Sequence, residues 1–169
     1  MADLSQAISF AALPVLVGAA FTDVASRRIP NTCCVMVAGF GIAARIASGD
    51  LLLSLLLAAT AFGILLAFWT RHWLGGGDVK LLAACALLVP AGAVAGLALA
   101  VALSGGLLAA AYLAGRAARL RLAPTAHSAR PHGILRRLWR IEGWRIRRGA
   151  PLPYACAIAA GCIFTIVAG

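Results

Sequence analysis

Two aspartates are the residues of this chain whose type and surroundings best suit chemistry. Asp23 lies in the stretch FTDVASRRIPN and Asp78 in GGGDVK, each within or beside apolar sequence. The 169-residue chain has only five acidic side chains against fifteen basic ones. Ionisable groups are costly beside a membrane interior and are usually functional there. The two carboxylates therefore predict acid–base chemistry at a membrane surface.

Paired carboxylates can hydrolyse a peptide bond when one is ionised and takes a proton from water while the other is protonated and polarises the carbonyl. At a separation of ~5 Å and an effective dielectric of ~20, two carboxylates repel each other by about 3 kcal/mol. That repulsion raises one pKa by roughly two units, to about 6. The pair therefore predicts a dyad that shares one proton, with no metal or organic cofactor required.

Each part of this pattern also has a simpler interpretation. Asp78 follows glycines at a predicted helix start, where aspartate is an ordinary N-cap. Asp23 ends a predicted helix, so an ion pair with Arg27 or Arg28 is its alternative. For the glycines before Asp78 the simpler interpretation is a flexible loop between two helices. The functional interpretation is that they adopt positive φ and, because they lack Cβ atoms, let a substrate backbone approach closely.

The elements that position these residues are predicted to be membrane helices. With 63% hydrophobic and 12% charged residues, the chain is typical of an all-α polytopic membrane protein. A spanning helix needs roughly 20 apolar residues. Three charge-free segments approach that length, over residues 4–22, 51–70 and 150–169. A further span begins at Asn31 and reaches about Ala47 if Arg45 snorkels to the interface.

The uncharged run from Leu81 to Gly115 is too long for one span. Pro90 and Gly92 predict its division into a short helix over 79–89 and a longer one that ends near Gly115. The total is then six transmembrane helices in a single domain over 1–169. Asp23 ends the first helix and Asp78 begins the fourth, so both lie at the same membrane face.

An outside N-terminus places the loops 22–32, 70–80 and 116–149 in the cytoplasm. These loops hold fourteen of the fifteen basic residues, which agrees with the positive-inside rule. The first span has no basic region before it, so we expect it to be retained and not cleaved as a signal peptide.

The basic loop over 116–149 predicts contact with anionic lipids and no binding of nucleic acid. Ile134, Leu138 and Ile141 form an apolar stripe that suits a helix lying on the membrane, although guidance of a substrate or partner is an alternative. The five cysteines include no C-x-x-C pair and are interpreted as small buried residues, not as a zinc site or disulfides.

Three sequence blocks resemble those of the type IV prepilin peptidases, a family of membrane aspartyl proteases, and specifically its short Tad/Cpa-type members. Asp23 with the RIPN at 28–31 is similar to the family pattern D-x4-K/R-I-P-N. GGGDVK, at 75–80, is similar to G-x-G-D-x-K. PYACAIA, at 153–159, is similar to P-Y-G-x-A-I-A, with Ala155 where the family often has glycine.

The resemblance implies that Asp23 and Asp78 are the catalytic pair and that Gly75 and Gly77 shape access to the substrate backbone. Arg28 and Lys80 are expected in supporting roles, and Pro30, Asn31, Pro153 and Tyr154 are expected to hold the helices in place.

The implied substrates are Flp-type prepilins and pseudopilins, whose leaders are cut after a glycine at the cytoplasmic face of the bacterial inner membrane. Longer relatives carry an N-terminal domain with C-x-x-C zinc motifs that is associated with N-methylation. Because this sequence lacks those motifs, we expect cleavage without methylation. The oligomeric state is not predicted.

Two other classes stay open at this point. A small transporter also has several apolar spans, but this sequence shows few intramembrane charges and no inverted repeat. A non-catalytic scaffold of pilus assembly would keep the fold, although the presence of both aspartates disfavours it. A serine protease is disfavoured because Ser104 has no histidine in any predicted span to activate it.

Overall fold

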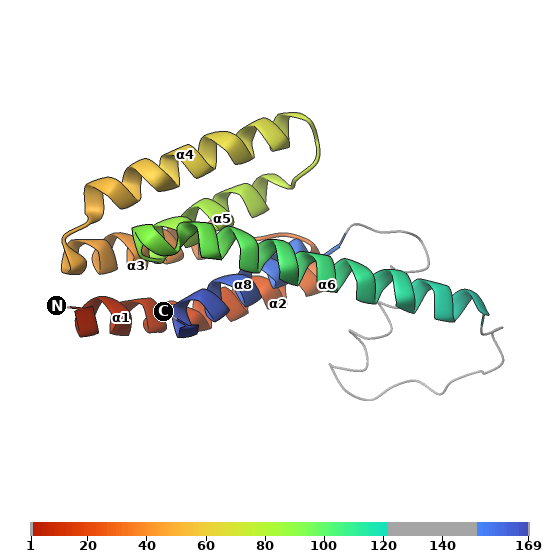
Figure 1. Cartoon of the computed structure of the whole chain (residues 1–169). Coiled ribbons are helices and arrows are strands. Elements are labelled where there is room, and N and C mark those ends of the chain that lie inside the picture. Colours follow the sequence, from red (N-terminus) through yellow and green to blue (C-terminus); the bar gives the residue numbers. More distant parts are fainter. Residues whose placement is uncertain (1, 122–151, 169) are drawn as a thin grey trace.

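The computed structural model describes residues 2–121 and 152–168, and every regular element within these residues is a helix. The predicted all-α class is therefore confirmed for the described part of the chain. The elements, labelled in Figure 1, are α1 (Ala2–Ala11), α2 (Leu13–Ser26), α3 (Asn31–Ser48), α4 (Leu51–Thr70), α5 (Gly76–Leu88), the 3-10 turn η1 (Ala91–Ala93), α6 (Val94–Arg121) and α8 (Tyr154–Ala168).

Four stretches of the described residues are long and apolar enough to cross a membrane, which makes the chain a multi-pass membrane protein. They are Leu4–Ser26, Asn31–Ser48, Leu51–Thr70 and Ala91–Gly115. The first of them comprises most of α1 together with α2. α8 is also apolar but has 15 residues, and α5 has 13. The count of six spans and the outside N-terminus stay predictions.

The middle of the chain follows the predicted boundaries closely. α4 begins at Leu51 and ends at Thr70, as the charge-free segment indicated. The long apolar run is broken where Pro90 predicted a break: α5 ends at Leu88, and α6 begins at Val94 after η1. Proline has no backbone N–H to continue a helix, so the chain restarts after it.

α2 and α5, which carry the two aspartates, and α6 run further than predicted. α2 continues to Ser26 and not only to residue 22, α5 begins at Gly76 and not at 79, and α6 continues to Arg121. The predicted loops 22–32, 70–80 and 116–149 each lose residues to these helices. Hydropathy marks where apolar sequence ends, whereas backbone hydrogen bonds continue a helix into its polar flank. The predicted surface helix at 134–141 lies outside the described residues.

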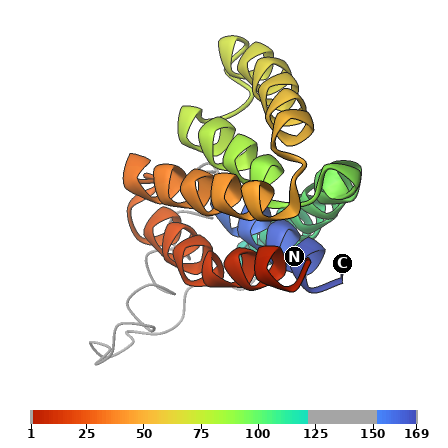
Figure 2. The same cartoon turned by 90° about the vertical axis from the view of Figure 1, so that its left-hand side faces the viewer.

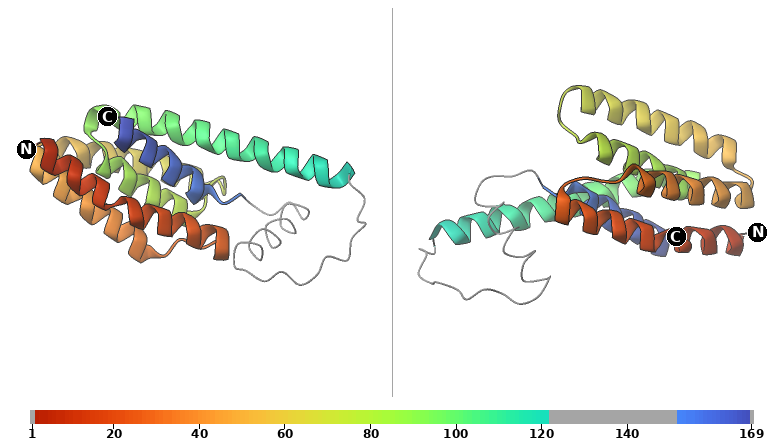
Figure 3. Two further views of the ribbon diagram at one scale, coloured as in Figure 1. Left: turned by 90° about the horizontal axis from the view of Figure 1, so that it is seen from below. Right: turned by 180° about the vertical axis from the view of Figure 1, so that it is seen from behind.

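The helices pack as an antiparallel bundle in which α5 and α8 hold the central contacts. α5 packs against α3 on one side and α4 on the other, while α8 packs against α2 and α6. Figure 2 shows α4 at one edge, followed by α5, α3 and the α1–α2 pair. The C-terminal part of α6 projects beyond the other helices (Figures 1 and 3).

Two glycines let the central helices approach their neighbours closely. A Cβ atom at Gly161 of α8 would lie 2.7 Å from the backbone N of Val101 in α6. One at Gly41 of α3 would lie 3.0 Å from the backbone of Leu87 in α5. Small residues at such crossings permit tight packing of membrane helices. These contacts fix α5 and α8, the two helices whose N-termini reach the candidate site.

Arg45 does not snorkel, contrary to the sequence-based expectation. Its side chain is 2% exposed and forms an ion pair with Asp50, with 3.3 Å between Nη1 and Oδ2. Arg45 Nη2 also donates a hydrogen bond to Ser5 Oγ of α1 at 3.1 Å, and Ser54 Oγ donates one to Asp50. An arginine snorkels when its charged group must reach water, whereas Arg45 binds Asp50 and Ser5 inside the bundle. Arg45 lies in the last turn of α3 and Asp50 is the N-cap of α4. Figure 1 shows the junction of α3 and α4 at the end of the bundle where the N-terminus lies.

Candidate active site

Asp23 lies in the last turn of α2 and is buried, with 7% of its surface exposed. Its Oδ2 accepts a hydrogen bond from the backbone N–H of Ala155 at 3.1 Å. Ala155 is in the first turn of α8, so the carboxylate faces the positive end of that helix dipole. α8 thus offers Asp23 the stabilisation that the C-terminal end of its own helix cannot provide.

Asp78 is the third residue of α5, and the N-cap of this helix is Gly75. The interpretation of Asp78 as the N-cap is therefore wrong by three positions. Its carboxylate instead accepts a hydrogen bond from the backbone N–H of Gly75. An acidic residue at the third helical position does the same in a capping box. The helix start consequently fixes the position of the Asp78 side chain.

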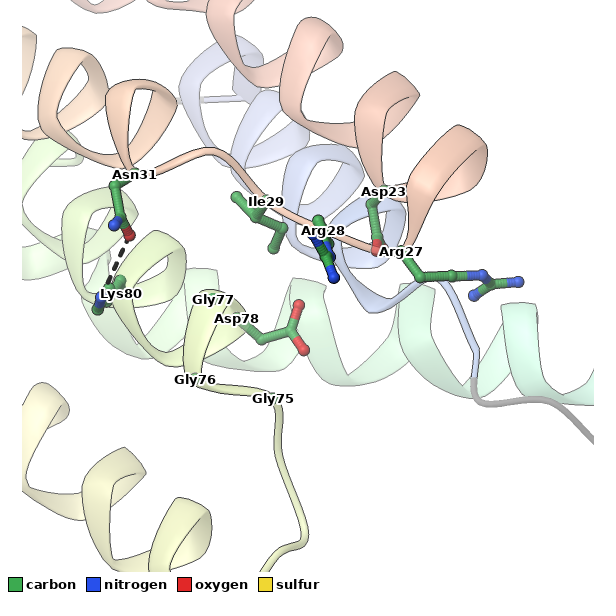
Figure 4. Close-up of a pocket in the computed structure, with 10 residues that line it drawn as sticks. All are labelled: Asp23, Arg27, Arg28, Ile29, Asn31, Gly75, Gly76, Gly77, Asp78 and Lys80. Atoms are coloured by element: carbon green, nitrogen blue, oxygen red, sulfur yellow. Dashed lines mark hydrogen bonds between the residues drawn. The ribbon is translucent and has the colours of Figure 1, made fainter.

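The two carboxylates share one cavity of about 360 Å³ at the same end of the bundle, as Figure 4 shows. Asp78 lies outside the long apolar spans, and its pKa is raised to about 6. Burial is the larger cause and the negative charge of Asp23 the second, while the hydrogen bond from Gly75 acts to lower the pKa. The value agrees with the one expected from repulsion alone, but burial contributes more than repulsion.

The glycines before Asp78 serve the site through their lack of a side chain, not through unusual backbone angles. The N-cap Gly75 has φ −72°, which any residue adopts, so the expectation of positive φ is wrong there. A Cβ atom at Gly75 would lie 2.7 Å from Oδ2 of Asp78, and one at Gly77 would lie 3.2 Å from Cβ of Ile29. Gly75 therefore leaves room for the carboxylate, and Gly77 lets the loop after α2 approach α5.

Arg28 and Lys80 both line the cavity, and both are exposed. Lys80 Nζ donates a hydrogen bond to Oδ1 of Asn31 at 3.2 Å, so its partner belongs to the start of α3. Figure 4 shows this pair on one side of Asp78, while Arg27 points away on the other. Lys80 therefore ties α5 to the segment that follows Asp23.

Three contributions to the site were not anticipated from the sequence: the amide of Ala155, the oxygen of Asn31 and the contact of Ile29 with Gly77. Asn31 and Ile29 belong to the RIPN stretch that had already been singled out. A polar residue within that stretch was a usable signal for Asn31. The Ala155 donor is a backbone group, which every residue but proline carries, so residue type gives no sign of it.

The arrangement can perform general acid–base chemistry on a substrate that enters the cavity. A carboxyl with a pKa of about 6 retains a proton near neutral pH, and a neighbouring carboxylate held by an amide can accept one. Within residues 2–121 and 152–168, no group of three or more His, Cys, Asp or Glu side chains could hold a metal ion.

The fold and the cavity define a multi-pass helical membrane protein with two carboxylates at one end of its bundle. Residues 10–112 match the family model of the type IV leader peptidase family. The match covers more than half of the chain, so this protein belongs to that family and is a leader peptidase-like protease. The resemblance to this family that was seen in the sequence is thereby confirmed at the level of the family.

The matched residues include both aspartates and the GGGDVK block but not the PYACAIA block at 153–159. Comparisons with curated proteins and with solved structures gave no match.

Proposed function

We propose that the protein is an aspartyl endopeptidase of the bacterial inner membrane that removes the leader peptide of Flp-type prepilins at the cytoplasmic face. The observation that carries this proposal is the shared cavity of Asp23 and Asp78, in which the pKa of Asp78 is raised to about 6. Family membership supports a leader peptide as the substrate. The basic residues of the flanking loops support the orientation.

In the proposed mechanism Asp78 carries the shared proton and Asp23 is ionised. Asp23 accepts the N–H of Ala155 at a helix N-terminus, and such a donor stabilises the charged form of a carboxylate. Asp23 removes a proton from water as the water oxygen attacks the scissile carbonyl carbon, and Asp78 donates its proton to the carbonyl oxygen. A neutral gem-diol results.

Breakdown of the gem-diol returns the dyad to its starting state. Asp23 passes its new proton to the amide nitrogen, the C–N bond breaks, and Asp78 recovers a proton from the diol hydroxyl. The products are an amine and a carboxylic acid, and no cofactor takes part. Gly75 and Gly77 keep the approach to Asp78 open, while Arg28 and Lys80 support the site from its rim.

The test is to co-express a Flp-type prepilin with the wild-type protein, with Asp23→Asn and with Asp78→Asn, and to compare the gel mobility of the precursor. Asparagine keeps the side-chain shape and removes the carboxylate. We expect the wild type to shorten the precursor and both variants to fail at equal abundance in the membrane.

Normal cleavage by either variant would refute the two-aspartate mechanism. Failure of the wild type on several prepilins would favour a non-catalytic scaffold instead. Ion flux in liposomes that depends on the aspartates would favour a transporter.

A further inference from the structure

A second cavity, of about 560 Å³, lies between α3, α4 and α5 and continues from the cavity of the dyad. Two residues, Asn31 and Lys80, line both cavities. Their side chains are joined by the hydrogen bond of 3.2 Å from Lys80 Nζ to Asn31 Oδ1. This pair therefore marks the point where the second cavity, here called the apolar groove, meets the candidate active site.

The walls of the apolar groove become apolar beyond this point. α3 contributes Cys34, Val35 and Ala38, α5 contributes Ala83, Ala84 and Leu87, and α4 contributes Phe62. From residue 31 to 38 of α3, and from 80 to 87 of α5, a helix advances ~10 Å. The groove thus extends for about two helical turns from the dyad cavity along the bundle.

The shape and chemistry of the groove suit a helix better than an extended peptide. Ala38, Ala83 and Ala84 are small, and small residues let a second helix approach closely in a membrane. A peptide between such walls must satisfy its own backbone groups, which a helix does. A helix start leaves N–H groups without intrahelical partners. The amide oxygen of Asn31, which accepts from Lys80 with one lone pair, has a second lone pair to accept from one of them.

We propose that the apolar groove binds an apolar helix of the substrate, located on the C-terminal side of the scissile bond, with the N-terminal end of that helix at Asn31 and Lys80. The helix would lie against α3 and α5, while the unwound residues before it enter the cavity of Asp23 and Asp78. This proposal rests on the proposed peptidase function, and it gives a membrane-inserted precursor a binding surface beyond the cavity of the dyad.

Site-specific cross-linking tests the occupant without requiring cleavage. The photo-cross-linker p-benzoylphenylalanine is placed at position 35 in the groove, where Val35 is 70% exposed, or at position 99 on α6, where Leu99 is 61% exposed. Both full-length proteins also carry Asp78→Asn and are irradiated in membranes with the precursor. We expect capture of the precursor's apolar segment from position 35 and not from position 99. Adducts to lipid alone, or equal capture from both positions, would overturn the proposal.

Filling the groove tests its effect on the reaction. Ala83→Leu adds bulk to the groove, and Ala98→Leu on the exposed face of α6 is the matched control. We expect Ala83→Leu to raise the KM for the full precursor about tenfold with little change in kcat. A soluble peptide that spans the cleavage site but lacks the apolar helix should be cut by Ala83→Leu as fast as by the wild type.

An unchanged KM for the full precursor, or an equal loss with both substrates, contradicts the proposal. If the wild type cuts neither substrate, the proposed function fails, and the cross-linking result still decides whether the groove holds the precursor helix.

Discussion

The two ends of the helical bundle each contain a partly or fully buried carboxylate, but the neighbours of those carboxylates differ. Asp78 lies near a second carboxylate, that of Asp23, and its pKa is raised to about 6. At the opposite end, partial burial acts to raise the pKa of Asp50, but the hydrogen bond from Ser48 and the charge of Arg45 outweigh it and hold that pKa below its usual range. An aspartate side chain is thus able to keep a proton at one end of the bundle, in Asp78, and is held ionised at the other end, in Asp50.

The difference shows that burial alone does not make a carboxylate reactive. Arg45 and Asp50 neutralise each other and tie α1, α3 and α4 together through Ser5 and Ser54. Asp23 and Asp78 have like charges, so keeping them together favours retention of a proton. We infer that the first pair serves stability and the second serves chemistry, and variants at each end can test that division.

The largest expected effect is the loss of cleavage in the dyad variants, measured as kcat with purified protein. Asp23→Asn and Asp78→Asn remove the base and the acid, and each such group contributes about 10²–10⁴-fold to a rate. Asp50→Asn is the matched control, because it removes a carboxylate from the other end of the bundle. A comparable loss of kcat in folded Asp50→Asn would contradict the division between the two ends.

The next effect is on stability and concerns Asp50→Asn. This change leaves the 2%-exposed Arg45 without its counter-charge. Removing one partner of a buried pair costs ~3–5 kcal/mol, and the partial exposure of Asp50 lowers our expectation to about 2–3 kcal/mol.

Denaturant unfolding in detergent micelles measures this cost. A double variant, Arg45→Leu with Asp50→Asn, should recover part of the loss because no unpaired charge is left. No difference between the double variant and Asp50→Asn would mean that the unpaired charge of Arg45 does not cause the loss of stability.

The pH dependence of cleavage sharpens the comparison further. The pKa of Asp78 is raised to about 6, so this carboxyl loses its proton as the pH rises through that value. If the protonated form is required, kcat/KM should fall by up to about tenfold for each pH unit above 6. The profile is measured from pH 5.5 to 8.5 with protein stability checked at each point. A flat profile would show that the proton on Asp78 is not needed, and Asp50→Asn should leave the profile unshifted.

The smallest expected effect follows from Gly75→Ala. The backbone angles of Gly75 suit alanine, so the only new feature is a Cβ atom 2.7 Å from Oδ2 of Asp78. Displacing that carboxylate should lower kcat about tenfold with little change in KM. Gly63→Ala on α4 is the control, since a Cβ atom there meets nothing within 4 Å. Equal kcat values for the two variants would show that Asp78 tolerates displacement.

The sequence was sufficient to predict the parts of this structure that depend on hydropathy and backbone chemistry. The bounds of α4 follow from the charge-free segment, and the break after α5 follows from Pro90. The meeting of Asp23 with Asp78 at one end of the bundle follows from the alternation of helix directions. These features depend on properties that each residue carries by itself.

Other features depend on partners far away in the chain, and the sequence alone did not reveal them. Arg45 near the end of a span suggested snorkelling, because the role of Ser5, forty residues earlier, was not visible. Gly75 was predicted to adopt positive φ, whereas its role is to leave room for the Asp78 carboxylate. That contact exists only once α5 has formed. The C-terminal end of α2, beside the site, was placed too early because polar residues continue the backbone hydrogen bonds of this helix, and the end of α6 was placed too early for the same reason.

The hydrogen bond from Ala155 to Asp23 joins residues 132 positions apart, and it has a consequence for biosynthesis. A ribosome releases α2 and α5 long before α8 is complete. Until α8 inserts and packs against α2, Asp23 has no hydrogen bond from the amide of Ala155. During synthesis Asp23 would thus lack this stabilising donor until the ribosome has made the 132 residues that follow it up to Ala155.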